Sequence, residues 1–547
     1  MAGRIRRDEV RQESQFFPHP IGVDLEMLQA VPEPGGGGAH RDEQLRERPR
    51  ALPDSRSERA PRGQVGPEWP STDRLAIVRS MQGVRVRAPG PTEERAPSLR
   101  QRLLGRLFEP VDIASLVYFR IAFGAIMLIE VWRYFSHGWI EEYFMDPVYH
   151  FTWGIFDWVR PWPDQGMYLH FVALGLLATL IILGAWYRPA AALFTVGFVY
   201  IFLLEKARYL NHFYLISLVA LIMIFVPANR AFSVDVVGRR ERRSDTAPAW
   251  TLWLIRTQLG IAYFFGGLAK LNGDWMAGQP LRMWLAGDTD FPIIGPLFTE
   301  EWMIYLMSWG SLLFDLLIVP ALLWRRTRPF AFVLAIVFNL MNWKLFSIGI
   351  FPWMMIAGTA MFFPPSWPRT LLGLGRSRTR RSSVSRIGPL RRSQRVTVGV
   401  LAGYLAVQVL VPLRHFLYPG NVSWTEEGHR FSWHMKLRDK EATAEFVATD
   451  PATGQTWEID PLHTLNEDQY DEMSTRPDMI LQLSHHFAEQ LRAQGYERIQ
   501  VRARVMASLN GRRPQLLIDP AVDIAAEDRS LLPADWIVPL RQPLRTP

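Results

Sequence analysis

A single lysine at the end of an apolar segment is the first side chain in this sequence that could do chemistry. Residues 261–275 read IAYFFGGLAKLNGDW, and Lys270 comes just before the chain turns polar at Asn272. One interpretation is snorkelling, in which the alkyl stem lies in hydrocarbon and the ammonium reaches the lipid headgroups. The other is that desolvation disfavours the charged form until the neutral amine can act as a base. The spacing alone favours snorkelling, because snorkelling lysines are common.

The sequence as a whole alternates strongly apolar blocks with strongly polar ones. Of its 547 residues 48% are hydrophobic, yet the mean hydropathy is close to zero. The formal net charge of +8 does not indicate a nucleic-acid partner, because the arginines lie between apolar segments, where they set membrane topology. There is no cysteine, which excludes disulfides, thiolate metal ligands and cysteine nucleophiles.

Nine apolar segments of roughly membrane-spanning length follow a polar N-terminal tail. The tail, residues 1–107, is basic and rich in proline, and its composition predicts disorder. The apolar segments are 112–134, 167–186, 190–205, 211–227, 250–270, 302–324, 329–346, 349–364 and 397–414. The positions of the basic loops predict a cytoplasmic N-terminus. The same rule places 135–166, 271–301 and everything after Arg414 on the opposite side.

This pattern predicts a polytopic α-helical membrane protein with about eight to nine transmembrane helices and a C-terminal β-rich extracytoplasmic domain. The predicted domains are the disordered cytoplasmic tail at 1–107, a transmembrane domain at 108–414 and the extracytoplasmic domain at 415–547. We expect the protein to lie in the plasma membrane, in contact with membrane lipid.

The C-terminal domain has the patterns of both strands and a helix. The stretches EATAEFVATD and TWEID flank Asp450-Pro-Ala-Thr-Gly and predict a β-hairpin. Residues 477–494 place apolar side chains at helical spacing, and 498–508 alternate in the way of a strand with one buried face. PQLLID, at 514–519, predicts a further strand.

The predicted topology brings two polar groups to a similar depth near the outer face. His212 begins one apolar segment on that side, and Lys270 ends another. A histidine there is more often a hydrogen-bonding partner, but beside a lysine it becomes a candidate for relaying a proton. Arg120 and Asp315 also lie within apolar segments. Because charges in hydrocarbon cost several kcal/mol, we expect both to be buried, in structural ion pairs.

Several classes of chemistry lack support in the sequence. The 12 histidines do not form the clusters of a membrane di-iron site, and HExxH, CxxC and Walker motifs are absent. Metal chemistry and nucleotide binding are therefore not expected. Any oxidative chemistry would use an organic cofactor that dissolves in the membrane.

Six longer stretches carry a family resemblance. They are EPVDIASLVYFRIAFG at 109–124, LNHFYL at 210–215, FFGGLAKLNGDW at 264–275, LFSIGIF at 345–351, HFLYPGNVSWTEEGHRFSWHMKL at 415–437 and SLNGRRPQLLIDPAVDI at 508–524. From about Phe108 to Leu540 the chain resembles the vitamin K-dependent γ-glutamyl carboxylases and their bacterial relatives, the HTTM group. Only the N-terminal tail lies outside the resemblance.

The resemblance implies roles for five residues. Lys270 would be the base that acts on reduced vitamin K, although the family often has two lysines in a row where this chain has Ala269 and Lys270. Asn211 and His212 would position the hydroquinone and stabilise its charged oxygen. The LFSIG stretch, with Asn342 and Ser347, would line the quinone cavity.

The implied activity is a carboxylase of the carbon–carbon lyase class with coupled vitamin K epoxidase activity. It would use vitamin K hydroquinone, with dioxygen and carbon dioxide as co-substrates and no metal. Its partner would be a glutamate-containing protein or peptide, bound near residues 415–437. The coupling is needed because removing the γ-proton of glutamate takes a far stronger base than any side chain near neutral pH.

Two other functions stay open. One is a quinol epoxidase that carboxylates no peptide, and the other is a non-enzymatic membrane protein that binds or transports quinones. The lack of cysteine also departs from the animal enzymes, in which a disulfide joins the membrane and lumenal parts. In this chain we expect the extracytoplasmic domain to dock by packing alone.

Overall fold

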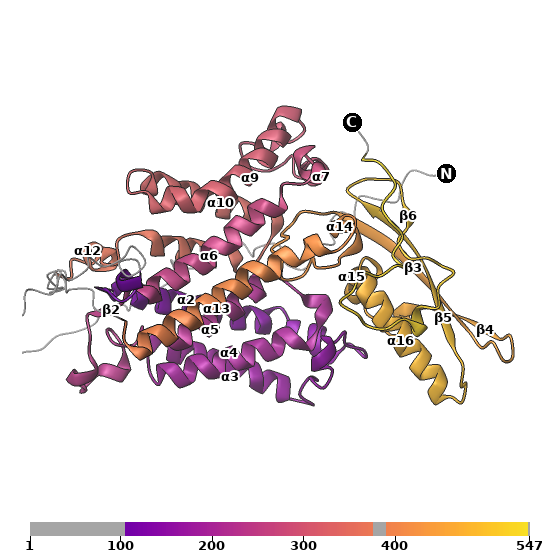
Figure 1. The fold of residues 1–547 in the computed structure, drawn as a ribbon, viewed down its shortest axis with the longest axis horizontal. Helices are drawn as coiled ribbons and strands as arrows, with labels where there is room; N and C mark the ends of the chain where they lie inside the picture. Colours follow the sequence, from indigo (N-terminus) through magenta and orange to yellow (C-terminus); the bar gives the residue numbers. More distant parts are fainter. Residues whose placement is uncertain (1–103, 376–389, 545–547) are drawn as a thin grey trace, which may run out of the picture. The chain divides into compact units, whose positions relative to one another are not determined.

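The computed structural model describes residues 104–375 and 390–544. The predicted disordered tail lies outside the described residues as far as residue 103. Nine described helices of nine residues or more precede the C-terminal domain (Figure 1). They are α2 Ala114–Ser136, α3 Gly166–Leu183, α4 Tyr187–Leu204, α5 Asn211–Phe225, α6 Ala249–Ala269, α9 Glu301–Leu323, α10 Arg328–Phe346, α11 Phe351–Thr359 and α13 Arg392–Leu413.

Six helical segments of the described chain are long and apolar enough to cross a membrane. They are α2, α3, α4, α9, α10 and α13 together with the turn that follows it. The predicted count of eight to nine is not confirmed. The 15 residues of α5 rise only about 22 Å, and α6 carries Arg256 and Gln258 among its apolar residues.

The candidate membrane helices direct apolar side chains outward. On α10 the side chains of Val333, Leu334 and Val337 are each more than half exposed. Soluble proteins rarely expose contiguous apolar surface of this kind. These faces therefore suit contact with lipid.

The loops at one end of the helices contact the C-terminal domain. Lys206, between α4 and α5, donates to Gln482 at 2.8 Å, and Gln482 donates to Thr152 at 3.0 Å. Asp274, after α6, pairs with Arg512. These contacts group 135–166 and 271–301 with the C-terminal domain, and the side of the membrane on which they lie stays a prediction.

A short two-stranded sheet joins the other end of the helices. Strand β1, Pro110–Asp112, pairs antiparallel with β2, Thr246–Pro248. The pairing places the start of α2 beside the start of α6. Short helices connect the longer elements elsewhere: α7 Gly273–Met276, α8 Leu281–Leu285, α12 Trp367–Leu371 and α14 Val422–Thr425.

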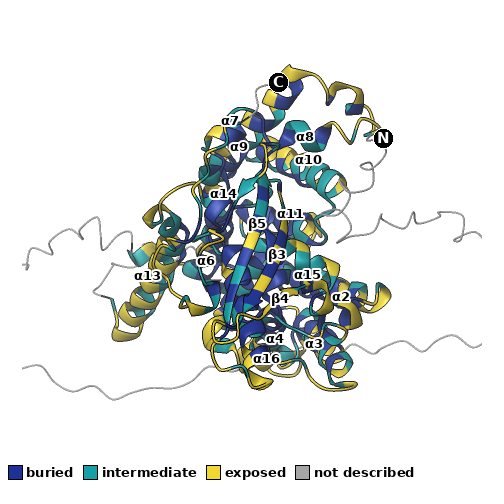
Figure 2. Ribbon diagram, turned by 90° about the vertical axis from the view of Figure 1, so that its right-hand side faces the viewer, coloured by how far each residue is buried: buried dark blue, intermediate teal, exposed yellow. Residues whose placement is uncertain are grey.

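The C-terminal domain is an antiparallel sheet in the order β4-β3-β5-β6 with two helices. Its elements are β3 Lys440–Thr449, β4 Thr456–Ile459, α15 Glu467–Ser474, α16 Pro477–Ala493, β5 Gln500–Leu509 and β6 Gln515–Leu516. The predicted hairpin, the helix and the strand at 498–508 are confirmed, whereas only Gln515–Leu516 of the predicted strand at 514–519 form one. Buried and exposed residues alternate along β3 and β5 (Figure 2), because a strand directs successive side chains to opposite faces.

Candidate active site

Lys270 is buried at the end of α6 and paired with an acid from another helix. Its Nζ lies 2.5 Å from Oδ2 of Asp315, which is in the middle of α9. The ammonium also lies 5.4 Å from the ring centroid of Trp275 and 5.9 Å from that of Phe338. Only 8% of Lys270 is exposed. The snorkelling interpretation is therefore wrong, because the amine points to a carboxylate inside the protein.

A glycine three residues before Lys270 makes room for the helix that carries its partner. A Cβ on Gly267 would lie 2.9 Å from the Leu316 side chain and 3.1 Å from Cβ of Asp315. A Cβ on Gly266 would lie 3.5 Å from Oδ2 of Asp315. Gly267 thus lets α9 approach α6 closely, whereas a Cβ on Gly266 would make only an ordinary contact with the carboxylate.

The residues after Lys270 bind the C-terminal domain. The side chain of Asn272 caps α7 by accepting from the backbone N–H of Trp275 at 2.9 Å. This turn presents Asp274, whose two oxygens each accept from Arg512 at 2.6 Å. Asn510 donates a third hydrogen bond to Asp274, at 2.7 Å. Docking by packing alone is thus wrong, since a buried bidentate ion pair also joins the two parts.

A cavity of about 210 Å³ lies where the helices meet the C-terminal domain. Asn211 and His212, at the start of α5, line it. Aromatic and aliphatic side chains of the helices and loops cover much of its wall, including Tyr134, Trp139, Tyr143, Phe213, Phe346, Ile348 and Phe351. The C-terminal domain adds polar and charged groups: His429, His434, Lys436, Arg438, Glu472 and Arg476.

The start of α5 is positioned by the C-terminal domain. Asn211 donates to the backbone carbonyl of His434 at 2.9 Å and accepts from the hydroxyl of Tyr209 at 3.1 Å. That hydroxyl in turn accepts from the backbone N–H of Phe431 at 2.7 Å. His212, whose ring centroid lies 5.9 Å from that of Phe351, presents its imidazole at the cavity wall.

Met435 connects the cavity to the Lys270–Asp315 pair. It lines the cavity, and its Cε would lie 3.0 Å from a Cβ on Gly266. Oδ2 of Asp315 lies 3.5 Å from the same point. Lys270 itself is not among the lining residues. The ion pair is therefore about one side chain away from the space that His212 faces.

Asn342 and Ser347 lie close to the cavity in sequence but do not line it. Ser347 is the C-cap of α10 in a left-handed conformation, φ 47°. Its neighbours Phe346 and Ile348 supply the wall instead. The LFSIG stretch thus reaches the cavity through its apolar residues, and the roles of Asn342 and Ser347 stay predictions.

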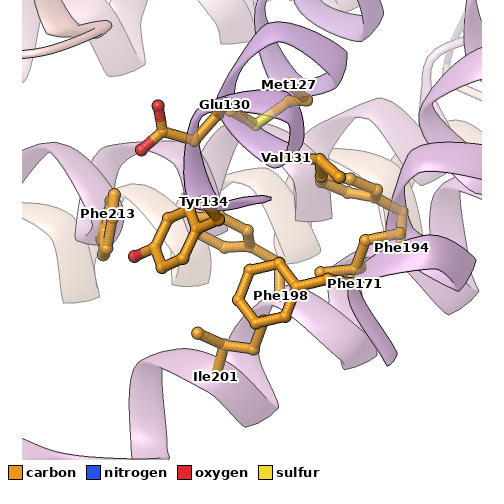
Figure 3. Close-up of a pocket in the computed structure, with 10 residues that line it drawn as sticks. Met127, Glu130, Val131, Tyr134, Phe171, Phe194, Phe198, Ile201 and Phe213 are labelled. Carbon is orange, nitrogen blue, oxygen red and sulfur yellow. The ribbon is translucent and has the colours of Figure 1, made fainter. Parts of the chain in front are cut away.

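Glu130 lies at the membrane end of the cavity, on α2. Its Oε2 accepts from Arg133 at 2.7 Å. Glu130, Tyr134 and Phe213 also line a second, much smaller space of about 20 Å³ among aromatic side chains of α3 and α4. Figure 3 shows the Glu130 carboxylate directed away from those aromatic rings. The smaller space and the larger cavity therefore share three wall residues.

One buried carboxylate organises the polar wall. Glu426, in the WTEEGHR stretch, lies 2.7 Å from Arg438 and 3.1 Å from Arg476. His429 lies 3.4 Å from it. Arg476 also pairs with Glu472. Two cations of this wall, Arg438 and Arg476, are therefore held in place by carboxylates.

The two cavity histidines of the C-terminal domain are neutral near pH 7. Burial, together with the neighbouring His415 and Arg414, lowers the pKa of His434 to about 3. Burial and the charge of Arg438 lower the pKa of His429 well below its usual range. Neutral imidazoles can donate and accept hydrogen bonds without adding charge to the cavity.

Sequence reasoning missed several residues of the site. Asp315 was expected in an ion pair but not with Lys270, and Glu426, Arg438 and Arg476 were not singled out. The adjacent glycines of FFGG were the available signal for the close helix approach. Arg120 is buried as expected, but it donates to the carbonyls of Ala228 and Phe232 rather than pairing with an acid.

The described residues contain no group of three or more histidines and acids that could hold a metal ion. The residues present do suit a quinone. The cavity combines an aromatic wall with His212 and Asn211, and a small apolar space among the helices shares part of that wall.

Comparison with known families agrees with this geometry. Residues 108–367 match the HTTM domain, and residues 393–543 match the lumenal domain of vitamin K-dependent γ-carboxylase. No solved structure matches the chain. The two matches define a membrane protein with a vitamin K-dependent carboxylase-like function. The chain belongs to the family of vitamin K-dependent γ-carboxylase relatives.

Proposed function

We propose that this protein is a vitamin K-dependent γ-glutamyl carboxylase that couples oxidation of vitamin K hydroquinone to its epoxide with carboxylation of protein glutamate. One observation carries the proposal. The cavity is built jointly by His212 and Asn211 of the HTTM part and by His434 to Arg438 of the lumenal-type part, with Lys270 beside it.

The shape of the cavity supports binding of a quinone headgroup. Its volume of about 210 Å³ is below the ~300–1,000 Å³ usual for drug-sized ligands, and so suits one aromatic ring system. An isoprenoid tail would continue along apolar surface, past Tyr134 and Phe213. Asn211 and His212 would fix the ring by hydrogen bonds to its oxygens.

The ion pair gives Lys270 a way to act as a base. Its ammonium donates to Oδ2 of Asp315, and transfer of that proton to the carboxylate leaves a neutral amine and a neutral acid. No net charge enters or leaves the buried site in this step. A low-dielectric environment disfavours charge separation, so burial favours the neutral pair. Asp315 is thus proposed as the group that holds the proton while Lys270 accepts one from the substrate.

Oxidation of bound vitamin K hydroquinone by dioxygen would supply the strong base that glutamate deprotonation requires. The protein's part is to orient the reactants and exclude water. His212 would stabilise negative charge on a quinone oxygen by a hydrogen bond. On the opposite wall Arg438, Arg476 and Lys436 would attract the carboxylate of a glutamate side chain, which enters from the side of the C-terminal domain.

The membrane arrangement is part of the proposal. We take α5, α6 and α11, which pack among the six candidate spans, as further crossings that complete eight to nine. The N-terminus would be cytoplasmic and the C-terminal domain extracytoplasmic, in the plasma membrane. A peptide substrate that has been exported would then reach the cavity directly.

The test uses the full chain in nanodiscs with reduced vitamin K, labelled bicarbonate and a short glutamate-rich peptide. Epoxide and label incorporation are followed together, with heat-treated protein as the control. Both products are expected. Epoxide without label would instead favour a quinol epoxidase, and quinone binding without either product would favour a non-enzymatic quinone protein.

A further inference from the structure

A third cavity lies at the opposite end of the helices from the C-terminal domain. It has a volume of about 570 Å³ and is formed by the α3–α4 turn and the loop between α5 and α6. Helix α4 runs from this cavity, at Tyr187, to the turn where Lys206 contacts Gln482 of the C-terminal domain. This cavity and the cavity that His212 lines therefore lie at opposite ends of one 18-residue helix.

The loop that forms this cavity is fixed from within. The buried Arg120 donates to the carbonyl of Ala228 at 2.9 Å and to that of Phe232. Gly184, φ 63°, makes room for the loop, since a Cβ there would lie 2.4 Å from Cβ of Ser233. This packing makes the cavity a built feature rather than a loose stretch of charged chain.

Asp235 is one of two acids in the lining, and its carboxylate already accepts hydrogen bonds from the protein. Its carboxylate accepts from the backbone N–H of Trp186 at 2.8 Å and of Tyr187 at 3.2 Å. It also accepts from the side chain of Asn229 at 2.7 Å. Its role is therefore to tie the two loops together.

Five arginines line the same cavity, against Asp235 and Glu241. They are Arg188, Arg230, Arg239, Arg242 and Arg243. All five are exposed, and none forms a salt bridge with any described residue. The arginines at the other end, such as Arg476 and Arg512, are paired with carboxylates. The unpaired guanidinium groups leave this cavity with an excess of positive charge.

Large apolar side chains of the same two connecting segments project into solvent. Trp186 is 76% exposed, Phe232 61% and Val237 74%. Arginine cations next to exposed aromatic and aliphatic groups are typical of surfaces that lie in the membrane interface. A free anion or a nucleic acid would satisfy the cations but leave this apolar surface in water.

We propose that this cavity binds the phosphate headgroup of an anionic phospholipid in the leaflet opposite the C-terminal domain. The planar guanidinium fork matches phosphate oxygens in bidentate hydrogen bonds. Basic pockets between membrane helices select anionic headgroups in the same way. Trp186, Phe232 and Val237 would contact the acyl region of the same lipid. The proposal does not depend on the proposed carboxylase activity.

The experiment measures lipid retention on detergent-purified full chain by native mass spectrometry. Phosphatidylglycerol and phosphatidylcholine with identical acyl chains are added in equal amounts. The variant R230Q/R239Q/R242Q removes three lining charges, and R325Q/R326Q, which removes two exposed arginines at the α9–α10 turn, is the matched control. Wild type and control are expected to retain phosphatidylglycerol preferentially, and the triple variant to lose that preference by roughly tenfold or more.

Three results would overturn the proposal. One is equal retention of the two lipids by the wild-type protein, which needs no variant and so is independent of folding. Another is unchanged preference in a triple variant whose melting temperature matches wild type. The third is displacement of phosphatidylglycerol by millimolar inorganic phosphate, which would indicate a site for free anions instead.

Discussion

Two buried ion pairs lie four residues apart on the FFGGLAKLNGDW stretch, and they are built differently. Asp274 is held by two nitrogens of Arg512, each at 2.6 Å, and by Asn510. Among the described residues the Lys270 ammonium donates one hydrogen bond, to Asp315, and otherwise faces aromatic rings. One pair joins two parts of the chain, and the other lies beside the cavity.

The difference indicates which pair can do chemistry. A bidentate contact with a further amide uses most of the acceptor positions of a carboxylate and fixes its place. A lysine with a single partner keeps donor positions that are not bonded, and one proton transfer makes both groups neutral. We therefore assign Asp274–Arg512 to docking and Lys270–Asp315 to proton transfer. The predictions below test that division.

Removing the amine should have the largest effect. Lys270→Met keeps much of the alkyl stem and abolishes the base, so we expect epoxide formation to fall by at least about a hundredfold. The fold should persist, because the lone Asp315 can become neutral by taking up a proton. Epoxide formation and the melting temperature are measured on the same preparation.

The control for this variant is Lys344→Met, at an exposed position on α10. It should turn over like wild type. Asp315→Asn sharpens the assignment, because the amide cannot hold the proton of Lys270, and turnover should fall while the protein stays folded. Normal turnover in Lys270→Met would contradict the assignment of Lys270 as the base. Normal turnover in Asp315→Asn would mean that Asp315 only holds Lys270 in place.

His212 should contribute less than the base, since it acts by hydrogen bonding to charge that develops elsewhere. We expect His212→Ala to lower epoxide formation by roughly ten- to a hundredfold without abolishing it. His463→Ala, an exposed histidine of the C-terminal domain, is the control. Kinetics identical to wild type in His212→Ala would remove this residue from the site.

Breaking the other pair should act on stability. Arg512→Met leaves the buried Asp274 without its cation, which costs about 3–5 kcal/mol in comparable pairs. Unfolding in detergent by denaturant should report that loss, and turnover should decline only in proportion to the folded fraction. The double variant D274N/R512M should recover part of the stability. A single variant as stable as wild type would contradict a docking role.

The same two pairs show what the sequence could predict. Lys270, Asn211 and His212 were recognisable because their motifs are local and unusual. Their partners were not, because Asp315 lies 45 residues from Lys270 and Arg512 lies 238 residues from Asp274. Such pairings depend on how helices and domains pack, which a hydropathy pattern does not specify.

The fold was predicted unevenly for a related reason. The alternation of apolar and polar residues in the C-terminal domain predicted β5 and its buried face. This is possible because successive side chains of a strand point to opposite faces of the sheet. In the helices the partner of a polar residue is set by tertiary contacts. Arg120 was therefore expected to pair with an acid, although loop carbonyls of Ala228 and Phe232 satisfy it.

The smallest expected effect concerns His434. Unlike the two ion pairs, it is a buried titratable group that has no acidic partner at its Nδ1 in the described part of the chain. Among the described residues its Nδ1 has no hydrogen-bond partner, and burial lowers its pKa to about 3. Between that value and the usual ~6.5 the unfolded chain binds more protons than the folded one, so stability falls as pH falls. At pH 5 this histidine should cost about 2 kcal/mol relative to pH 7.

His434→Gln cannot titrate, so its stability should fall less steeply with acid than that of wild type. Comparing the two proteins cancels the carboxylates, which also lose their charge in this range. His463→Gln, at an exposed site, should behave like wild type. Parallel curves for wild type and His434→Gln would mean that His434 takes up its proton in the folded state. That result would place a cation at the cavity wall, where the ring is now neutral.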